Sequence, residues 1–209
     1  MIIGRMSELE NEGGGVMDNK AGKTRQSKKI LLAAFECIAS KGYANVSLRD
    51  IADEAGVVLS QLNYYYQNKD GLFAEVIKMM MQEYLEEVEN HLKNGVTAKE
   101  KVAALIKYFQ EVLEGKPKLF RLLCDFSSMA LWSESFGNLL RKLFEDISNL
   151  IEKHALNNIP AKSNLREYAP GSIARMLFGA MLGTAIQVVL DPQEKNLPEA
   201  LNAIELVFE

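Results

Sequence analysis

Between residues 58 and 66 the chain gathers uncharged hydrogen-bonding side chains at helical spacing. Val58, Leu62 and Tyr66 fall four residues apart, so a helix would turn all three toward the protein interior. The opposite side would present uncharged side chains: Leu59, Ser60, Gln61, Asn63 and Tyr64. Amides and hydroxyls on such a face can pair with the edges of base pairs in the major groove of DNA.

The preceding residues supply an element that could position this face. Ser47 followed by Asp50 is a capping-box pattern and predicts a helix of about nine residues that begins near Ser47. Gly56 stands where its apolar periodicity ends, and a glycine there can adopt the left-handed conformation that reverses the chain. Two short helices across a tight turn are typical of a helix-turn-helix. A generic pair of short helices in an all-helical protein is the alternative.

Cations flank the motif on both sides. Asn68 offers an N-cap, which places Lys69 in the first turn of the next helix, where the helix dipole favours anions such as phosphate. Residues 21–71 carry seven basic and five acidic side chains, a net charge of +2, whereas the whole chain is at −4. The whole chain is therefore not expected to bind polyanions in general, and any contact with DNA would come from a local basic patch. An unevenly charged solvated surface would give the same count. The cations before the first helical stripe are Lys23, Arg25, Lys28 and Lys29.

A family resemblance covers residues 24–72. The residues that carry it are Ile30-Leu31 with Ala34 and Phe35, Lys41-Gly42-Tyr43, Ser47-Leu48-Arg49-Asp50-Ile51-Ala52, Ala55-Gly56-Val57, and Asn68-Lys69 with Leu72. This run resembles the amino-terminal domain of TetR-family transcriptional regulators. The family usually has phenylalanine where Tyr66 stands, often tyrosine at Asn63 and often histidine at Tyr64.

The resemblance implies DNA contacts that the residue chemistry supports. We expect base contacts from Ser60, Gln61 and Asn63. Contacts with the DNA backbone are expected from Ser47, Tyr64, Tyr65 and Lys69.

The fold class expected for the whole chain is all-α, with about nine helices. Residues 1–22 lack a periodic apolar face and are expected to form a mobile arm. Residues 23–71 would form a three-helix helix-turn-helix domain, and residues 72–209 a larger helical domain for effector binding and dimerisation. Capping and glycine or proline signals predict helices at about 69–91, 97–113, 119–130, 133–157, 163 or 170–190, and from Pro198 through Phe208.

In the resembled family the larger domain encloses a pocket for a small, usually lipophilic effector. Soft and aromatic side chains that could line one are Tyr84, Tyr108, Phe109, Phe120, Cys124, Met129, Trp132, Phe136 and Met176. Core packing is the favoured explanation for each residue taken singly, because any helical core of this size contains such side chains, and only the set suggests a pocket. Asp125, Glu134 or His154 could supply a polar anchor.

Small residues gather at Gly179, Ala180, Gly183, Thr184 and Ala185 within an apolar helix. Close approach of another helix would cover this side. The resemblance favours a two-fold homodimer in which the last two helices pair, and burial within one chain is the alternative.

Composition narrows the function classes. Cys37 and Cys124 are too few and too far apart for a disulfide framework, so a reducing cytoplasm fits. The longest apolar run, Met176 to Leu190, is too short to span a bilayer and includes Gln187. No catalytic or metal motif occurs, and we expect no enzyme, cofactor or metal.

The sequence therefore predicts a cytoplasmic, homodimeric repressor that leaves a near-palindromic operator when a small lipophilic effector binds. An alternative is a helix-turn-helix protein whose larger domain recruits a protein partner and needs no small molecule.

Overall fold

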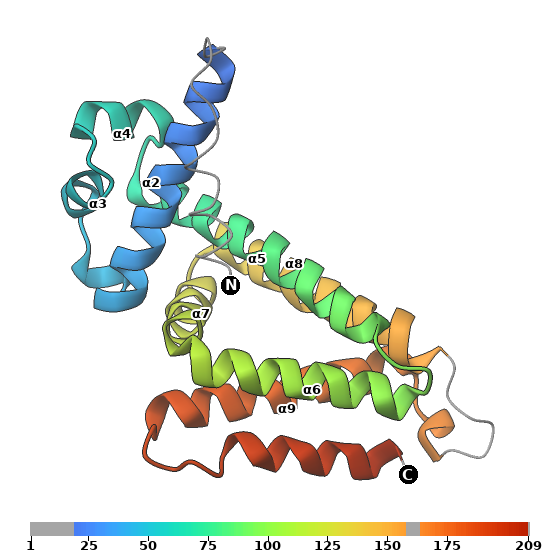
Figure 1. Cartoon of the computed structure of the whole chain (residues 1–209). Helices are drawn as coiled ribbons and strands as arrows, with labels where there is room; N and C mark the ends of the chain where they lie inside the picture. The colour runs from blue at the N-terminus through green and yellow to red at the C-terminus, as the bar shows by residue number, and fades with distance from the viewer. Residues whose placement is uncertain (1–18, 158–163, 209) are drawn as a thin grey trace. The chain divides into compact units, whose positions relative to one another are not determined.

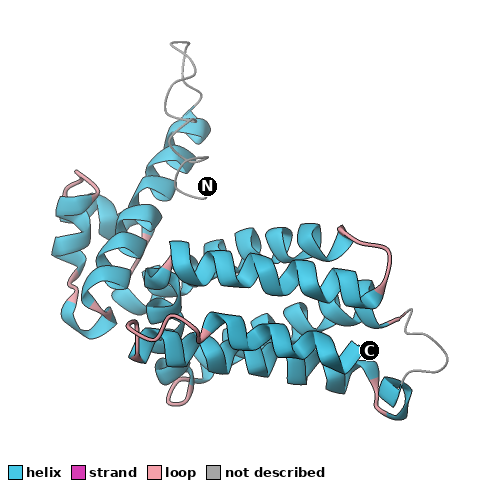
Figure 2. Ribbon diagram, turned by 60° about the horizontal axis from the view of Figure 1, so that its bottom comes forward, coloured by secondary structure: helices cyan, strands magenta, loops and turns pink. Residues whose placement is uncertain are grey.

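The computed structural model describes residues 19–157 and 164–208, and helix is the regular structure throughout these ranges (Figure 2). The predicted all-α fold is confirmed. The α-helices are labelled in Figure 1. The elements in chain order are α2 (Asn19–Lys41), the 3-10 turn η2 (Tyr43–Asn45), α3 (Leu48–Glu54), α4 (Leu59–Tyr65), α5 (Lys69–Lys93), α6 (Ala98–Gly115), α7 (Pro117–Ala130), α8 (Glu134–Ile151), the π-helical turn η3 (Glu152–Leu156), the 3-10 turn η4 (Asn164–Glu167), α9 (Pro170–Leu190) and the 3-10 helix η5 (Pro198–Phe208).

The chain forms two compact units, residues 1–83 and 84–209. The division falls inside α5, so this helix gives its first turns to the amino-terminal unit and its last turns to the carboxy-terminal unit. The sequence places the domain boundary after residue 71, near the start of the same helix.

The amino-terminal unit packs α2, α3 and α4 around one apolar centre. Ile30, Ile38, Ile51 and Phe73 are fully or almost fully buried in it. Helix α2 begins at Asn19, earlier than the predicted start at Lys23, and residues 1–18 of the predicted arm lie outside the described part.

The carboxy-terminal unit is built on a larger apolar core. Its buried residues come from every helix from α5 to η5 except α7: Val88, Leu92, Val102, Leu105, Ile106, Ile151, Ala155, Leu156, Leu165, Ile173, Ala174, Leu177, Phe178, Met181 and Leu201. The predicted capping box of α6 is present, since Thr97 accepts from the Glu100 amide and the Glu100 carboxylate accepts from the Thr97 amide.

Two predicted helices differ from the expectation. The stretch predicted as one helix over 133–157 changes from α to π geometry at Glu152. The last helix, Pro198–Phe208, has 3-10 rather than α geometry.

Helix α9 is longer than its apolar run. It begins at Pro170 and spans 21 residues, which is long and apolar enough to cross a membrane by length and composition alone. The sequence prediction counted only the shorter run from Met176, whereas the helix adds the residues from Pro170. The buried side of α9, including Ile173 and Met181, packs on α6, α7, α8 and η5. This packing accounts for the apolar side chains of the buried side, whereas Met176 and Leu190 are exposed.

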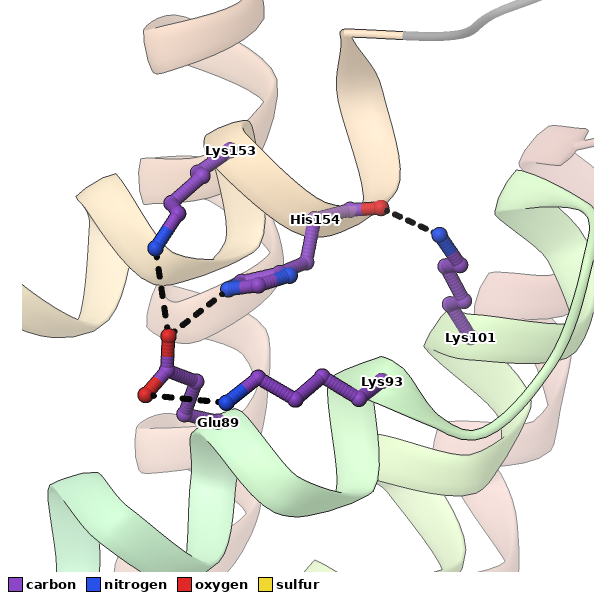
Figure 3. A network of polar contacts seen from close by, with 5 residues as sticks. All are labelled: Glu89, Lys93, Lys101, Lys153 and His154. Atoms are coloured by element: carbon purple, nitrogen blue, oxygen red, sulfur yellow. Dashed lines mark hydrogen bonds and ion pairs between the residues drawn. The ribbon is translucent and has the colours of Figure 1, made fainter.

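A polar network ties three elements of the carboxy-terminal unit together (Figure 3). The Glu89 carboxylate of α5 lies 3.0 Å from His154 Nε2 and 3.2 Å from Lys153 Nζ, both on η3. Lys93, one turn along α5, lies 3.3 Å from the other carboxylate oxygen. From α6, Lys101 Nζ donates to the His154 carbonyl oxygen at 3.0 Å. The network joins the last turns of α5 to the π-helical turn.

The pKa of Glu89 indicates how this network should respond to acid. Hydrogen bonds from His154 first, then from Lys153 and Lys93, lower that pKa from 4.5 to about 2. Because the folded pKa is depressed, the carboxylate stabilises the fold above its unfolded pKa and loses that contribution as the pH falls toward 2. We expect the difference in unfolding free energy between the wild type and Glu89→Gln to be constant near neutral pH and to shrink below pH 4.5. Urea unfolding at a series of pH values measures it, and a difference that persists unchanged to pH about 3 would contradict a role for the charge.

Candidate nucleic-acid interface

Helix α3 begins with the predicted capping box. The Asp50 amide donates to Ser47 Oγ at 3.2 Å, and the Ser47 amide donates to Asp50 Oδ2 at 2.7 Å. The hydroxyl of Ser47 also donates to the same carboxylate at 2.5 Å. These hydrogen bonds lower the pKa of Asp50. Ser47 therefore has a structural role in starting α3, beside the DNA-backbone contact predicted for it.

Gly56 makes the turn between α3 and α4. Its φ is +60°, in the left-handed region that favours glycine. The Gly56 amide donates to the Asp53 carbonyl at 3.1 Å, and the Val57 amide donates to the Ala52 carbonyl at 2.9 Å. These bonds satisfy the last carbonyls of α3 and set the direction of α4.

Helix α4 buries one side and exposes the other, as its pattern predicts. Leu62 is fully buried and Tyr66, just after the helix, is 8% exposed. Val58 was predicted to face inward, but it is 66% exposed. It is the N-cap residue, with φ −76° and ψ 146°, so the helical periodicity does not apply to it.

The exposed side of α4 is uncharged. Ser60, Asn63 and Tyr64 are exposed, while Gln61 and Tyr65 are half-buried. Residues 60–65, less than two helical turns, thus carry two amides, a hydroxyl and two phenol groups. Such a surface can read base edges but has little attraction for phosphate. The attraction for phosphate must come from cations on neighbouring elements.

Two side-chain contacts brace α4 against α2. The Ser27 and Tyr66 hydroxyls lie 2.8 Å apart, which gives a polar partner to the phenol that replaces the family's usual phenylalanine. Lys23 Nζ donates to the Tyr64 hydroxyl at 3.2 Å, and this hydrogen bond raises the pKa of Lys23. These partners are 39 and 41 residues apart in the chain, so no local sequence signal pairs them.

Lys69 is held from within the unit. Its ammonium donates to the Tyr43 carbonyl and lies 4.1 Å from the centre of the Tyr43 ring. Burial lowers the pKa of Lys69. Asn68 caps α5 as predicted, since its Oδ1 accepts from the Gly71 amide at 2.7 Å. An ammonium has three donors, so the predicted phosphate contact of Lys69 would use those that Tyr43 leaves.

Comparison with known proteins decides what this geometry belongs to. The sequence profile described as "Bacterial regulatory proteins, tetR family" matches residues 30–76, which include α3, the Gly56 turn and α4. The chain belongs to the TetR family of transcriptional regulators. It is thus a DNA-binding regulator of the helix-turn-helix type and not an enzyme.

Relatives of this TetR-family regulator match along most of its length. The fatty acid metabolism regulator protein of Bacillus subtilis (strain 168) is 26% identical over 180 residues, covering 84% of this chain and 90% of its own. The HTH-type transcriptional regulator BetI of Brucella suis is 26% identical over 182 residues, covering 86% of each chain.

Solved structures show the same fold. A transcriptional regulator from Rhodococcus sp. Rha1 superposes with a TM-score of 0.73 at 19% identity, covering 87% of this chain and 95% of its own. FadR from Bacillus subtilis, crystallised in complex with stearoyl-CoA, superposes with a TM-score of 0.68 at 23% identity, covering 87% of this chain and 97% of its own.

The residues predicted for an effector pocket divide into two aromatic groups and two outliers. Tyr84, Tyr108, Phe109 and Phe120 gather around one apolar cluster, in which the Phe109 and Phe120 rings meet edge to face at 5.3 Å. Burial raises the pKa of Tyr108, whose ring stacks on His91 at 4.2 Å.

The second group lies on α7 and α8. Phe136 packs on Phe126 with ring centres 6.1 Å apart. Cys124 and Met129 are half-buried, and burial raises the pKa of the Cys124 thiol. Both cysteines are free thiols.

The structure does not bring Trp132 and Met176 into either group. Trp132 is 89% exposed at the turn between α7 and α8, and Met176 is 53% exposed on α9. Of the suggested polar anchors, His154 is taken up by the Glu89 network. Within residues 19–157 and 164–208, no three histidine, cysteine or acidic side chains are grouped so that they could hold a metal ion.

Proposed function

We propose that this regulator is a repressor that binds a near-palindromic operator as a homodimer and leaves it when a small lipophilic effector binds. The uncharged exposed side of α4, held on a capped and braced helix-turn-helix, is the observation that carries the proposal. In a two-fold dimer, two such helices would enter successive major grooves about 34–36 Å apart.

The dimer contact is proposed for the last two helices. Helix α9 has an exposed stripe that contains Met176, Gly179, Ala180 and Leu190, and its small residues permit close approach of a partner helix. Leu206 of η5 adds a further exposed apolar side chain. A second copy of the same surface would cover both, because a two-fold interface is self-complementary.

Effector control is proposed for residues 72–209, and DNA binding for residues 23–71. Two relatives support a lipophilic effector: the fatty acid metabolism regulator by its name and FadR by its stearoyl-CoA complex. The boundary between the two units falls inside α5. An effector that binds more tightly to one position of the last turns of α5 would therefore change how the two α4 helices of a dimer are spaced for DNA. The free thiols and the DNA partner fit the cytoplasm.

Selection of bound duplexes from a random pool tests the proposal. We expect an inverted repeat whose half-sites are one helical turn apart, recovered with a dimer. A single half-site or no enriched sequence would count against the paired α4 helices.

Substitutions on α4 and α5 should separate base reading from backbone binding. Gln61→Ala is expected to cost about 1–3 kcal/mol on the selected operator and to relax one base position, because it removes a side chain able to pair with a base edge. Lys69→Ala should weaken selected and random duplexes alike and flatten the salt dependence. Fluorescence anisotropy at several salt concentrations measures both.

Gln67→Ala is the matched control for Gln61, since Gln67 is an exposed glutamine outside α4. It should change operator affinity by under about 0.5 kcal/mol. If Gln61→Ala weakened operator and random DNA equally, base reading by Gln61 would be wrong.

One feature favours the alternative in which the carboxy-terminal unit recruits a protein. Leu131 and Trp132 form an apolar pair at the turn after α7, and they are 80% and 89% exposed. Thermal unfolding against a set of lipophilic compounds separates the two functions. A specific stabiliser that also releases operator DNA supports effector control, whereas operator binding that no compound changes supports recruitment.

A further inference from the structure

A cleft of about 380 Å³ opens on the carboxy-terminal unit. One wall is the turn from α6 to α7, with Glu114, Pro117 and Arg121. The other wall is the end of α9 and the loop that leads to η5. The residues of this second wall are Val188, Val189, Pro192, Glu194, Lys195 and Pro198.

Both walls are fixed by the backbone. Pro117, Pro192 and Pro198 restrict φ at three places around the cleft. The side-chain amide Nε2 of Gln110 on α6 donates to the Pro198 carbonyl at 2.8 Å and to Asn202 Oδ1 at 2.9 Å. The start of η5 is therefore tied to α6, and the cleft is largely formed before any ligand arrives.

The floor of the cleft is the outer surface of the first aromatic group. Leu113 and Phe120 belong to that buried cluster, and Val188 and Val189 pack against it. Phe120 in turn meets the Phe109 ring. An apolar chain in the cleft would therefore contact Leu113 and Phe120, which belong to the same cluster as the predicted pocket residues Tyr84, Tyr108 and Phe109.

The rim carries two cations without a carboxylate partner. Among the described residues, neither Arg121 nor Lys195 makes an ion pair, whereas the Glu194 carboxylate accepts the Asn196 amide at 3.0 Å. The charged residues that line the cleft are the cations Arg121 and Lys195 and the carboxylates Glu114 and Glu194. An anionic head group would find two charged donors at the mouth of an apolar floor.

We propose that this cleft binds the effector, and that the effector is an amphiphile with a short apolar chain and an anionic head group. The proposal rests on effector control as proposed above. The chain lies on Leu113, Val188 and Val189, and the head group pairs with Arg121 and Lys195. The cleft volume is near the lower end of the about 300–1,000 Å³ typical of ligand sites, so it admits a short chain and not a long acyl-CoA.

Isothermal titration with straight-chain carboxylates of increasing length tests the site. Affinity should rise about fourfold for each added methylene until the floor is filled, and then stay level. The alcohol and the amine of the same chain length should bind more weakly, because they lack the anionic head. An amine that bound more tightly than the carboxylate would overturn the anionic head group.

Two exposed-residue variants locate the ligand. Arg121→Ala with Lys195→Ala should weaken carboxylate binding about 10- to 100-fold and leave alcohol binding unchanged. Lys107→Ala removes an exposed cation of α6 outside the cleft and should change neither. Carboxylate binding that the double variant leaves intact would overturn the assignment.

Operator binding separates this proposal from the function on which it rests. If a carboxylate bound in the cleft and left operator affinity unchanged, effector control through this cleft would fail. If another compound released the operator equally from wild type and double variant, effector control would stand and the cleft would be wrong as its site.

Discussion

Replacing Leu62 by alanine is expected to lower the free energy of unfolding of the amino-terminal unit by about 2–5 kcal/mol. Leu62 is fully buried, and it is the one residue of α4 that the structure places wholly inside. Truncation removes buried methyl groups and leaves a cavity between α4 and its neighbours, because a helix of seven residues has few other contacts that could close it.

Val58→Ala is the matched control. It removes two methyl groups about one turn before Leu62, but from a side chain that is 66% exposed, so it should cost under about 0.5 kcal/mol. Urea unfolding followed by circular dichroism measures both changes, and hydrogen exchange over residues 48–66 shows whether the loss falls on α3 and α4. Equal losses for both variants would contradict the packing described for α4.

The elements that the sequence predicts correctly are set by interactions between residues only a few positions apart in the chain. The capping boxes at Ser47 and Thr97 are formed with partners three residues on, so their spacing alone reveals them. Gly56 and Asn68 act on the turn or helix beside them. Each of these signals is local chemistry, and each predicted the observed element.

The exceptions have causes that the local pattern does not contain. Val58 fits the apolar spacing of α4, but it precedes the helix, and only the start of the helix decides which way it points. The change to π geometry at Glu152 accompanies the network with Glu89, 65 residues earlier than His154. Residue types alone do not show that Lys69 pairs with the Tyr43 carbonyl, 26 residues away.

The effector residues show the same limit. Phe120 and Trp132 are both predicted to line the effector pocket because their side chains are aromatic, yet Phe120 is buried and Trp132 is exposed. Which side of a helical hairpin faces the core depends on packing partners far along the chain. The cleft is likewise formed by segments that lie about 70 residues apart in the chain, so no local sequence motif predicts it.

The hairpin of α7 and α8 gives the second large effect. Phe126→Ala is expected to lower the free energy of unfolding of the carboxy-terminal unit by about 3–5 kcal/mol. The Phe126 ring is fully buried and meets Phe136 of the next helix nearly at right angles, at 82°. Its loss removes an aromatic contact between α7 and α8 as well as the buried area of the ring.

Trp132→Ala, at the turn of the same hairpin, removes a larger ring that is 89% exposed. In the isolated protein it should change stability by under about 0.5 kcal/mol. Chemical unfolding at two protein concentrations checks the pair of variants. A large, concentration-dependent loss for Trp132→Ala would show that a second copy buries this turn, because only association makes stability depend on protein concentration. A small loss for Phe126→Ala would instead contradict the packing of α7 on α8.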